Sequence, residues 1–89
     1  MNVCFKVHIT GKVQGVYFRS SAQQQAIDYS LSGYARNSPN GDVEVLLCGA
    51  QENIDKMLVW LGHGPEQAEV ETIEHEQVPR QEHNFFSIG

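Results

Sequence analysis

The order of strand-like and helix-like apolar patterns is the feature that most constrains the fold of this chain. Apolar and polar residues alternate over 3–9 and over 42–49, as in strands with one buried face. Over 51–61, apolar residues recur at positions i, i+3, i+4 and i+7, as on one face of a helix. The composition of 19–31 also favours a helix. The remaining expected strands lie at 34–37, 68–78 and 84–88.

This order predicts an α+β fold, the ferredoxin-like βαββαβ sandwich, in which two helices cover one face of an antiparallel sheet. Ser-Pro-Asn-Gly at 38–41 predicts a tight turn that joins the second and third strands as a hairpin. The alternation in 68–78 slips between Val70 and Ile73, which predicts a β-bulge. Such a fold hosts many functions, so the function has to be argued from a site.

The first expected helix, 19–31, has a weak apolar face. We expect Ala22, Ala26 and Ile27 to pack inward from this helix. Gly33 is expected to cap its end, because glycine readily adopts the left-handed backbone conformation that terminates many helices.

Length and net charge limit the classes of function. The 89 residues, 40% of them hydrophobic, suit one small domain spanning 1–89. The apolar runs are too short to cross a membrane and the N-terminal residues lack a signal-peptide pattern, so we expect a cytoplasmic protein. The net charge of −5 argues against a nucleic acid as the main partner, because such proteins usually present a basic face. A local pocket on an acidic protein can still bind a small anion.

The stretch GKVQGVYFRS at 11–20 is the first candidate for such a pocket. Gly11 and Gly15 permit a tight loop whose N–H groups converge on one point, and the helix that follows adds its partial positive charge. Arg19 supplies a planar fork that can hold two phosphate oxygens. No Lys-Ser/Thr pair follows Gly15, so the loop differs from that of the P-loop NTPases. Taken alone, the stretch also fits a structural turn with a surface arginine.

Two sequence blocks taken together indicate the function more specifically than the stretch 11–20 alone. GKVQGVYFR at 11–19 and GYARNSPNGDVEV at 33–45 resemble the signatures of the acylphosphatase family in residues, in spacing and in the order of elements. The resemblance covers essentially the whole chain. One departure is at the end, where family members often have a basic or aromatic residue after the last strand and this chain has Ile88 and Gly89. It implies hydrolysis of the carboxyl–phosphate bond of small acyl phosphates, without metal or cofactor. It also implies that inorganic phosphate or a similar anion binds as product or inhibitor.

The resemblance assigns roles to individual residues. It places the phosphate-binding loop at Gln14, Gly15, Val16, Tyr17 and Phe18, the phosphate-gripping arginine at Arg19, and the water-positioning asparagine at Asn37. These residue types suit the reaction, because a carboxylate leaves without being protonated and the loose phosphoryl transition state tolerates a weak nucleophile. We expect the side chains of Tyr17 and Phe18 to pack, so that these residues contribute through their backbone N–H groups.

Several neighbouring polar residues have simpler interpretations. Asn37 precedes a proline-containing turn, and alone it would be interpreted as a cap of that turn. Arg36 should point to the opposite face of the strand and lie on the surface. The four histidines have no spacing typical of metal ligands, so we expect no metal site. They are His8, His63, His75 and His83.

The two cysteines, Cys4 and Cys48, face away from the apolar side of their strands. In this fold the first and third strands are antiparallel neighbours, and the register that pairs the cysteines also sets Lys6 opposite Leu46 and His8 opposite Glu44. Directly opposed residues have Cα atoms roughly 4.5–5.5 Å apart, which a disulfide accepts. We therefore hypothesise a Cys4–Cys48 disulfide. The alternative is two reduced thiols, as is usual in the cytosol.

Two other functions compete with hydrolysis. A non-catalytic anion-binding module could keep the loop, although the presence of both Arg19 and Asn37 favours the enzyme. An RNA-binding domain would show aromatic and basic residues on the outward face of its central strands. Here that face carries Cys4, Lys6, His8, Glu44, Leu46 and Cys48. We therefore expect no nucleic acid or membrane partner, and a monomer.

Overall fold

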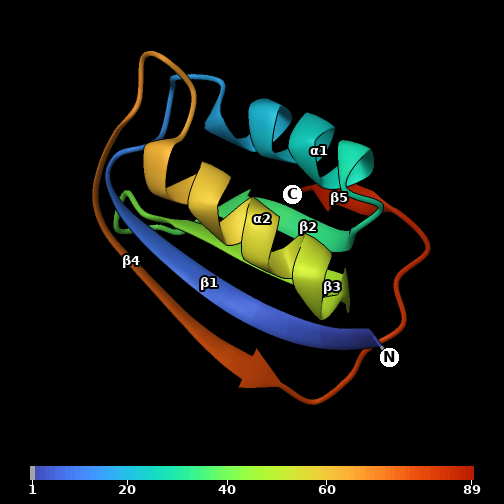
Figure 1. Ribbon diagram of the computed structural model, residues 1–89. Coiled ribbons are helices and arrows are strands. Elements are labelled where there is room, and N and C mark those ends of the chain that lie inside the picture. Colours follow the sequence, from blue (N-terminus) through green and yellow to red (C-terminus); the bar gives the residue numbers. More distant parts are fainter. Residues whose placement is uncertain (1) are drawn as a thin grey trace.

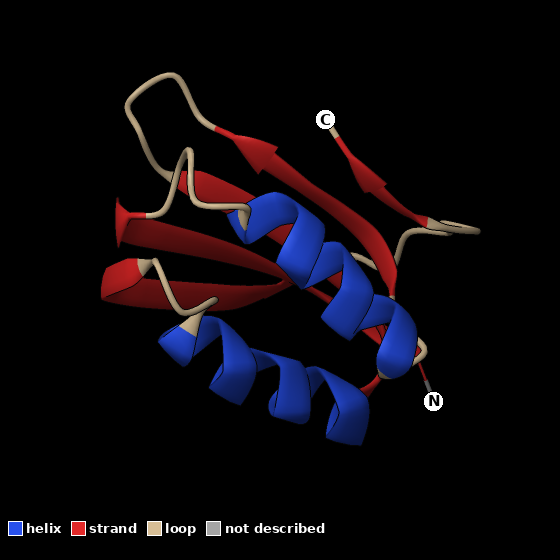
Figure 2. Cartoon of the chain, turned by 90° about the horizontal axis from the view of Figure 1, so that it is seen from above, coloured by secondary structure: helices blue, strands red, loops and turns tan. Residues whose placement is uncertain are grey.

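The computed structural model describes residues 2–89, which contain five strands and two helices. The elements are β1 (Asn2–Lys12), α1 (Phe18–Asp28), β2 (Ser32–Asn37), β3 (Val43–Ala50), α2 (Gln51–His63), β4 (Glu69–Val78) and β5 (Phe86–Ile88). The strands form one sheet in the order β4-β1-β3-β2-β5, and both helices cover the same face of it (Figures 1 and 2). This is the expected ferredoxin-like α+β fold.

The last strand adds one parallel pair to a sheet that is otherwise antiparallel, as expected. β1, β2, β3 and β4 pair antiparallel, but β5 runs parallel to β2, with Phe86 opposite Gly33. β4 ends beside Cys4, and the connection 79–85 carries the chain along that end of the sheet to the far edge (Figure 1). β5 therefore begins at the end where β2 also begins, and the two strands run in the same direction.

The core lies between the sheet and the two helices. The inward-facing residues of β1 and β3 are those that the alternation indicates: Val7, Ile9, Val43, Val45 and Leu47 are fully buried. Ile54, Met57 and Leu61 of α2 pack against them, as the helical spacing predicts. Burial of one such aliphatic side chain contributes about 1.5–3 kcal/mol, so this layer supplies most of the driving force for folding.

Helix α1 ends earlier than expected. Ser30 adopts a left-handed conformation with φ of 56°, and the Leu31 N–H donates to the Ala26 carbonyl at 2.8 Å, which closes the helix end. The prediction that Gly33 caps this helix is wrong, because Gly33 lies within β2 against the Leu46 carbonyl. The inward packing of Ala22 and Ala26 is confirmed. That of Ile27 is wrong, since it is 56% exposed and Phe18 fills the inward face instead.

The predicted bulge in β4 is present. Thr10 pairs with Thr72 and the next residue of β1, Gly11, pairs with Val70, so Glu71 is the extra residue. Gly11 has a φ of 122°, and a side chain at this position would collide with the backbone of Glu69. Beyond the bulge, β1 remains paired with β4 as far as Lys12, which is opposite Glu69.

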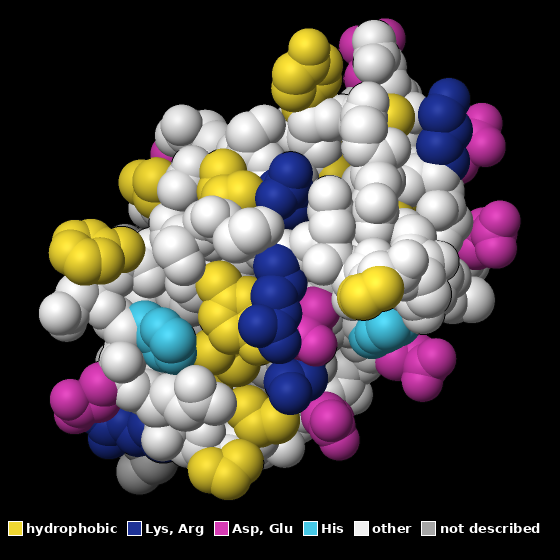
Figure 3. Space-filling view, turned by 180° about the vertical axis from the view of Figure 1, so that it is seen from behind, with side chains coloured by type: hydrophobic (Ala, Val, Ile, Leu, Met, Phe, Trp, Pro, Cys, Tyr) yellow, Lys and Arg dark blue, Asp and Glu magenta, His cyan; other side chains and the backbone are white. Residues whose placement is uncertain are grey.

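The sheet face opposite the helices is partly covered. Figure 3 shows this face, on which Lys and Arg side chains lie beside acidic and histidine side chains. At one end of it, Cys4, Leu46 and Cys48 form a second buried cluster. The connection 79–85 contributes to the cover, because the Gln81 N–H donates to Cys4 Sγ at 3.3 Å. Alternation alone marks these three residues as outward-facing and does not reveal this cover.

Neither helix within residues 2–89 has the length and the apolar character that crossing a membrane requires.

Candidate functional site

The loop 13–17 joins β1 to α1 and is anchored by its apolar side chains. Val13 and Val16 are buried. Phe18, the first residue of α1, is 2% exposed, and the centre of its ring lies 6.0 Å from the centre of the Trp60 ring. Gly15, between these anchors, has a φ of 72°. The anchors therefore hold the loop from its inner side, and Gly15 and Tyr17 between them are exposed.

The backbone of this loop offers hydrogen-bond donors. The N–H groups from Gly15 to Arg19 donate to no acceptor among residues 2–89, and α1 has neither a capping side chain nor an acidic residue in its first turn. The beginning of a helix carries a partial positive charge from its unpaired N–H groups. The loop and the first turn of α1 together therefore favour an anion.

Arg19 lies in the first turn of α1 beside these donors. Its Nη1 donates to the Gly89 carbonyl at 2.6 Å, and the Gly89 N–H in turn donates to the Ala35 carbonyl at 3.0 Å. The guanidinium has five N–H groups, so this contact orients the side chain and leaves further donors for an anion.

Asn37 is the last residue of β2, and it is exposed. It shares with Arg19 a pocket of about 360 Å³ on the surface. The pocket is lined by Val13, Gly15, Tyr17, Phe18, Arg19, Ser20, Asn37 and Ile88. Tertiary structure thus brings the two signature blocks together, although they lie on different elements.

Arg36 is on the surface of the other face, as expected. Its Nη2 donates to the Glu44 carboxylate at 2.8 Å, and its guanidinium lies 4.8 Å from the centre of the Tyr34 ring. The Tyr34 hydroxyl also donates to Glu44, at 2.6 Å. Burial acts to raise the pKa of Glu44, but the Tyr34 hydroxyl and the Arg36 charge outweigh it and hold that pKa below its ordinary value. Burial and the neighbouring Glu44 raise the pKa of Tyr34.

Tyr17 differs from its expected packing role. It is 78% exposed and has a φ of 60°, in the left-handed region that is uncommon for a residue other than glycine. Its neighbours Val16 and Phe18 both point into the core, and the left-handed turn between them directs the tyrosine outward. For Phe18 the expectation of packing is confirmed.

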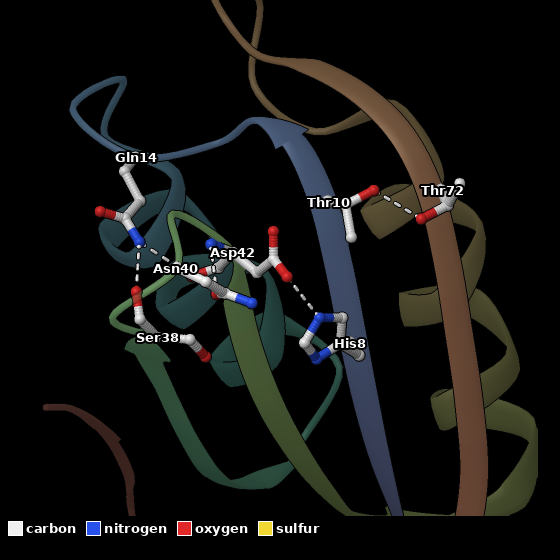
Figure 4. A network of polar contacts seen from close by, with 7 residues as sticks. All are labelled: His8, Thr10, Gln14, Ser38, Asn40, Asp42 and Thr72. Atoms are coloured by element: carbon white, nitrogen blue, oxygen red, sulfur yellow. Dashed lines mark hydrogen bonds and ion pairs between the residues drawn. The ribbon is translucent and has the colours of Figure 1, made fainter.

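The side chain of Gln14 does not line the pocket and contacts the turn that follows β2 instead. Its Nε2 donates to the carbonyl of Ser38 and to the carbonyl of Asp42, both at 2.9 Å (Figure 4). Asp42 is also contacted from β1, where His8 Nε2 lies 2.6 Å from Asp42 Oδ2. Ser38, Asp42 and His8 are not among the site residues that the sequence predicts. Both acceptors of Gln14 Nε2 are backbone carbonyls. Because every residue has a backbone carbonyl, the sequence does not indicate which ones accept these hydrogen bonds.

Cys4 and Cys48 lie at the opposite end of the sheet from the loop. They are directly opposed across β1 and β3, and a disulfide joins them. The predicted pairs Lys6–Leu46 and His8–Glu44 are also confirmed. Within residues 2–89, no three His, Cys, Asp or Glu side chains converge as metal ligands do.

Comparisons with known proteins give a consistent assignment. The acylphosphatase family model matches residues 5–88. An acylphosphatase of Colwellia psychrerythraea is 73% identical over 89 residues, which are 100% of each chain. The structure of an acylphosphatase from Coxiella burnetii has a TM-score of 0.96 at 35% identity and covers 99% of this chain and 93% of that one. The crystal structure of acylphosphatase from Bacillus subtilis has a TM-score of 0.94 at 29% identity, with 100% and 99% covered. The chain belongs to the acylphosphatase family of enzymes.

Proposed function

We propose that this enzyme cleaves acyl phosphates by direct attack of water on a phosphoryl group held by Arg19 and the loop 14–18. The water oxygen forms a bond to phosphorus as the bond between phosphorus and the acyl oxygen breaks. The electron pair of that bond leaves with the carboxylate, and the proton of the water passes to a phosphate oxygen. The products are a carboxylate and inorganic phosphate.

The chemistry of the substrate explains why so few residues are needed. The leaving carboxylate is stable without protonation, so no general acid is required. The transition state is loose and spreads charge over the three equatorial oxygens, so catalysis depends on positioning and on positive charge. The N–H groups from Gly15 to Arg19 and the Arg19 guanidinium supply that charge, and we include independence from metal ions in the proposal.

Asn37 has the second role. An amide is too weak a base to remove a proton, but it can accept and donate hydrogen bonds and so hold a water in line with the breaking bond. The observation that carries the proposal is that Asn37 and Arg19 line the same pocket as the loop. A phosphoryl group on the loop would have both side chains within the same small space.

The test is release of phosphate from benzoyl phosphate in the presence of EDTA. We expect rapid turnover by the wild type, with kcat/KM lower by about 10³-fold in Arg19→Ala and by about 10²-fold in Asn37→Ala. Arg36→Ala is the matched control, because it removes a neighbouring exposed arginine from the other face of β2.

Each alternative outcome has a distinct meaning. Loss of wild-type turnover in EDTA that added Mg²⁺ restores would contradict independence from metal. Full activity of Asn37→Ala would remove that residue from the water site. A folded wild type that binds phosphate but releases none from acyl phosphates would indicate an anion-binding module.

Two expectations from the sequence remain part of the proposal, namely a cytoplasmic location and a monomeric state. Light scattering coupled to gel filtration tests the monomer directly.

A further inference from the structure

The proposed mechanism requires two segments of the chain to keep a fixed separation. The phosphoryl group is held by the loop and Arg19, whereas the water is held by Asn37 at the end of β2. In-line attack requires the water and the phosphorus at a defined distance and angle, and a displacement of about 1 Å can lower the rate 10²-fold. Some contact must therefore connect the two segments.

Gln14 makes such a contact. Its Nε2 donates to the carbonyls of Ser38 and Asp42 at 2.9 Å, and these residues bracket the turn that directly follows Asn37. An amide nitrogen carries two N–H groups, and both are used here. The side chain is half-buried, and both of its donors form hydrogen bonds with the turn.

The turn is closed by its own backbone as well. The Ser38 N–H donates to the Asp42 carbonyl at 2.8 Å, and the Gly41 N–H donates to the Ser38 carbonyl at 3.1 Å. Gln14 thus shares both of its acceptors with the bonds that close the turn. If the loop moves at Gln14, the hydrogen-bonded turn 38–42 therefore moves with it as a whole, and not one residue of it alone.

The sheet holds the same turn from its other side. His8 of β1 contacts the Asp42 carboxylate, and Asn40 Oδ1 accepts a hydrogen bond from the Asp42 N–H at 3.2 Å (Figure 4). The turn 38–42 is therefore held between the sheet and the phosphate-binding loop. Gln14 is the member of this network that belongs to the loop.

We infer that Gln14 is a positioning residue that sets the placement of Asn37 relative to the phosphoryl group. This inference rests on the proposed function. It predicts that Gln14 contributes to kcat and hardly to phosphate binding, because its side-chain donors contact the turn rather than the anion.

The test compares Gln14→Ala and Gln14→Met with the wild type on benzoyl phosphate. Methionine has a similar length but no donor, so it serves if the alanine variant folds poorly. We expect kcat to fall by on the order of 10–100-fold in both variants. KM and the inhibition constant of inorganic phosphate should change less than about threefold.

Gln23→Ala is the matched control, because Gln23 Nε2 also donates to a distant carbonyl, that of Phe86, at 2.7 Å. Its kcat should change less than about twofold.

A double-mutant cycle separates positioning through Asn37 from an independent role. In the Asn37→Ala background, Gln14→Ala should lower kcat less than about twofold further, because the residue that Gln14 positions is already gone. If the fold-losses in kcat of the two single variants multiply in the double variant, the inference is overturned. A kcat of Gln14→Ala equal to that of the wild type would overturn it as well. An inactive Gln14→Ala whose phosphate affinity falls in parallel would make Gln14 a ligand instead.

The same experiment distinguishes the two proposals. If Asn37→Ala alone keeps full activity, the proposed role of Asn37 fails, and the role of Gln14 fails with it. If Asn37→Ala loses activity while Gln14→Ala does not, only the inference about Gln14 fails.

Discussion

The two ends of the sheet are held together by different means. At the disulfide end, Cys4 and Cys48 are bonded to each other and buried with Leu46 beneath the connection 79–85. At the site end, the loop 13–17 and the turn 38–42 are exposed at their tips and joined through hydrogen bonds to backbone carbonyls. Figure 1 shows the N-terminus and the loop before α1 at opposite ends of the sheet.

The difference follows from what each end has to expose. An anion site needs unpaired backbone N–H groups in contact with water, so it cannot be stabilised by burying them. The disulfide end has no such requirement and can be closed by a covalent bond and apolar packing. Stability and catalysis should therefore respond to changes at different ends.

Removal of the disulfide should have the largest effect on stability. The bond joins residues 44 apart in sequence, and loop-closure entropy gives about 4 kcal/mol for a loop of that size. We expect Cys4→Ala/Cys48→Ala to lower the free energy of unfolding by up to that amount in urea titrations. Because the disulfide lies at the far end of the sheet, kcat of the remaining folded enzyme should stay within about twofold. A large drop in kcat without loss of stability would contradict the separation of the two ends.

Two glycines with positive φ allow a matched test of the same comparison. A side chain on Gly33, near the disulfide end, would collide with the Leu46 carbonyl, whereas a side chain on Gly15 would meet nothing within 4 Å. Both positions are strained for alanine, with φ of 135° and 72°. We expect Gly33→Ala to lower the free energy of unfolding by about 3 kcal/mol and Gly15→Ala by about 1 kcal/mol. Equal losses in thermal or urea unfolding would show that backbone angle alone, and not the collision, decides the cost.

The site end should contain strain that can be relieved. Tyr17 is left-handed and exposed, so its side chain gives little packing energy in return for an unfavourable backbone conformation. We expect Tyr17→Gly to be about 1 kcal/mol more stable than Tyr17→Ala, which removes the same ring but keeps the conformational penalty. The greater freedom of glycine in the unfolded chain reduces the difference. Identical unfolding midpoints for the two variants would argue against strain at this position.

Glu44, on the surface between the two ends, should have the smallest effect on the free energy of unfolding. The folded-state pKa of Glu44 lies below its unfolded value, so its contribution to stability is present above the unfolded pKa and is lost as pH falls through the folded one. Stability should therefore decrease on acidification below about pH 4.5, and Glu44→Gln should flatten this decrease by less than about 1 kcal/mol. Urea titrations between pH 3 and pH 7 measure it. Parallel curves for wild type and variant would exclude a contribution from Glu44.

Much of the fold could be predicted from residue patterns because local periodicity reflects burial. The alternation in β1 and β3 gives the buried face correctly, and antiparallel pairing with the cysteines opposed gives the register. The bulge in β4 is visible as a slip in the same alternation. The two signature blocks identify Arg19 and Asn37, which do line one pocket.

Sequence alone determined the order of elements, the register of β1 against β3 and the family, because each depends on residue type at a fixed spacing. Tertiary structure alone decided the direction of β5, the cover over the cluster of Cys4, Leu46 and Cys48, the exposure of Tyr17 and the partners of Gln14. The physical reason is that these features depend on backbone paths and carbonyl groups. Every residue has the same backbone groups, so their positions emerge only when distant segments of the chain pack together.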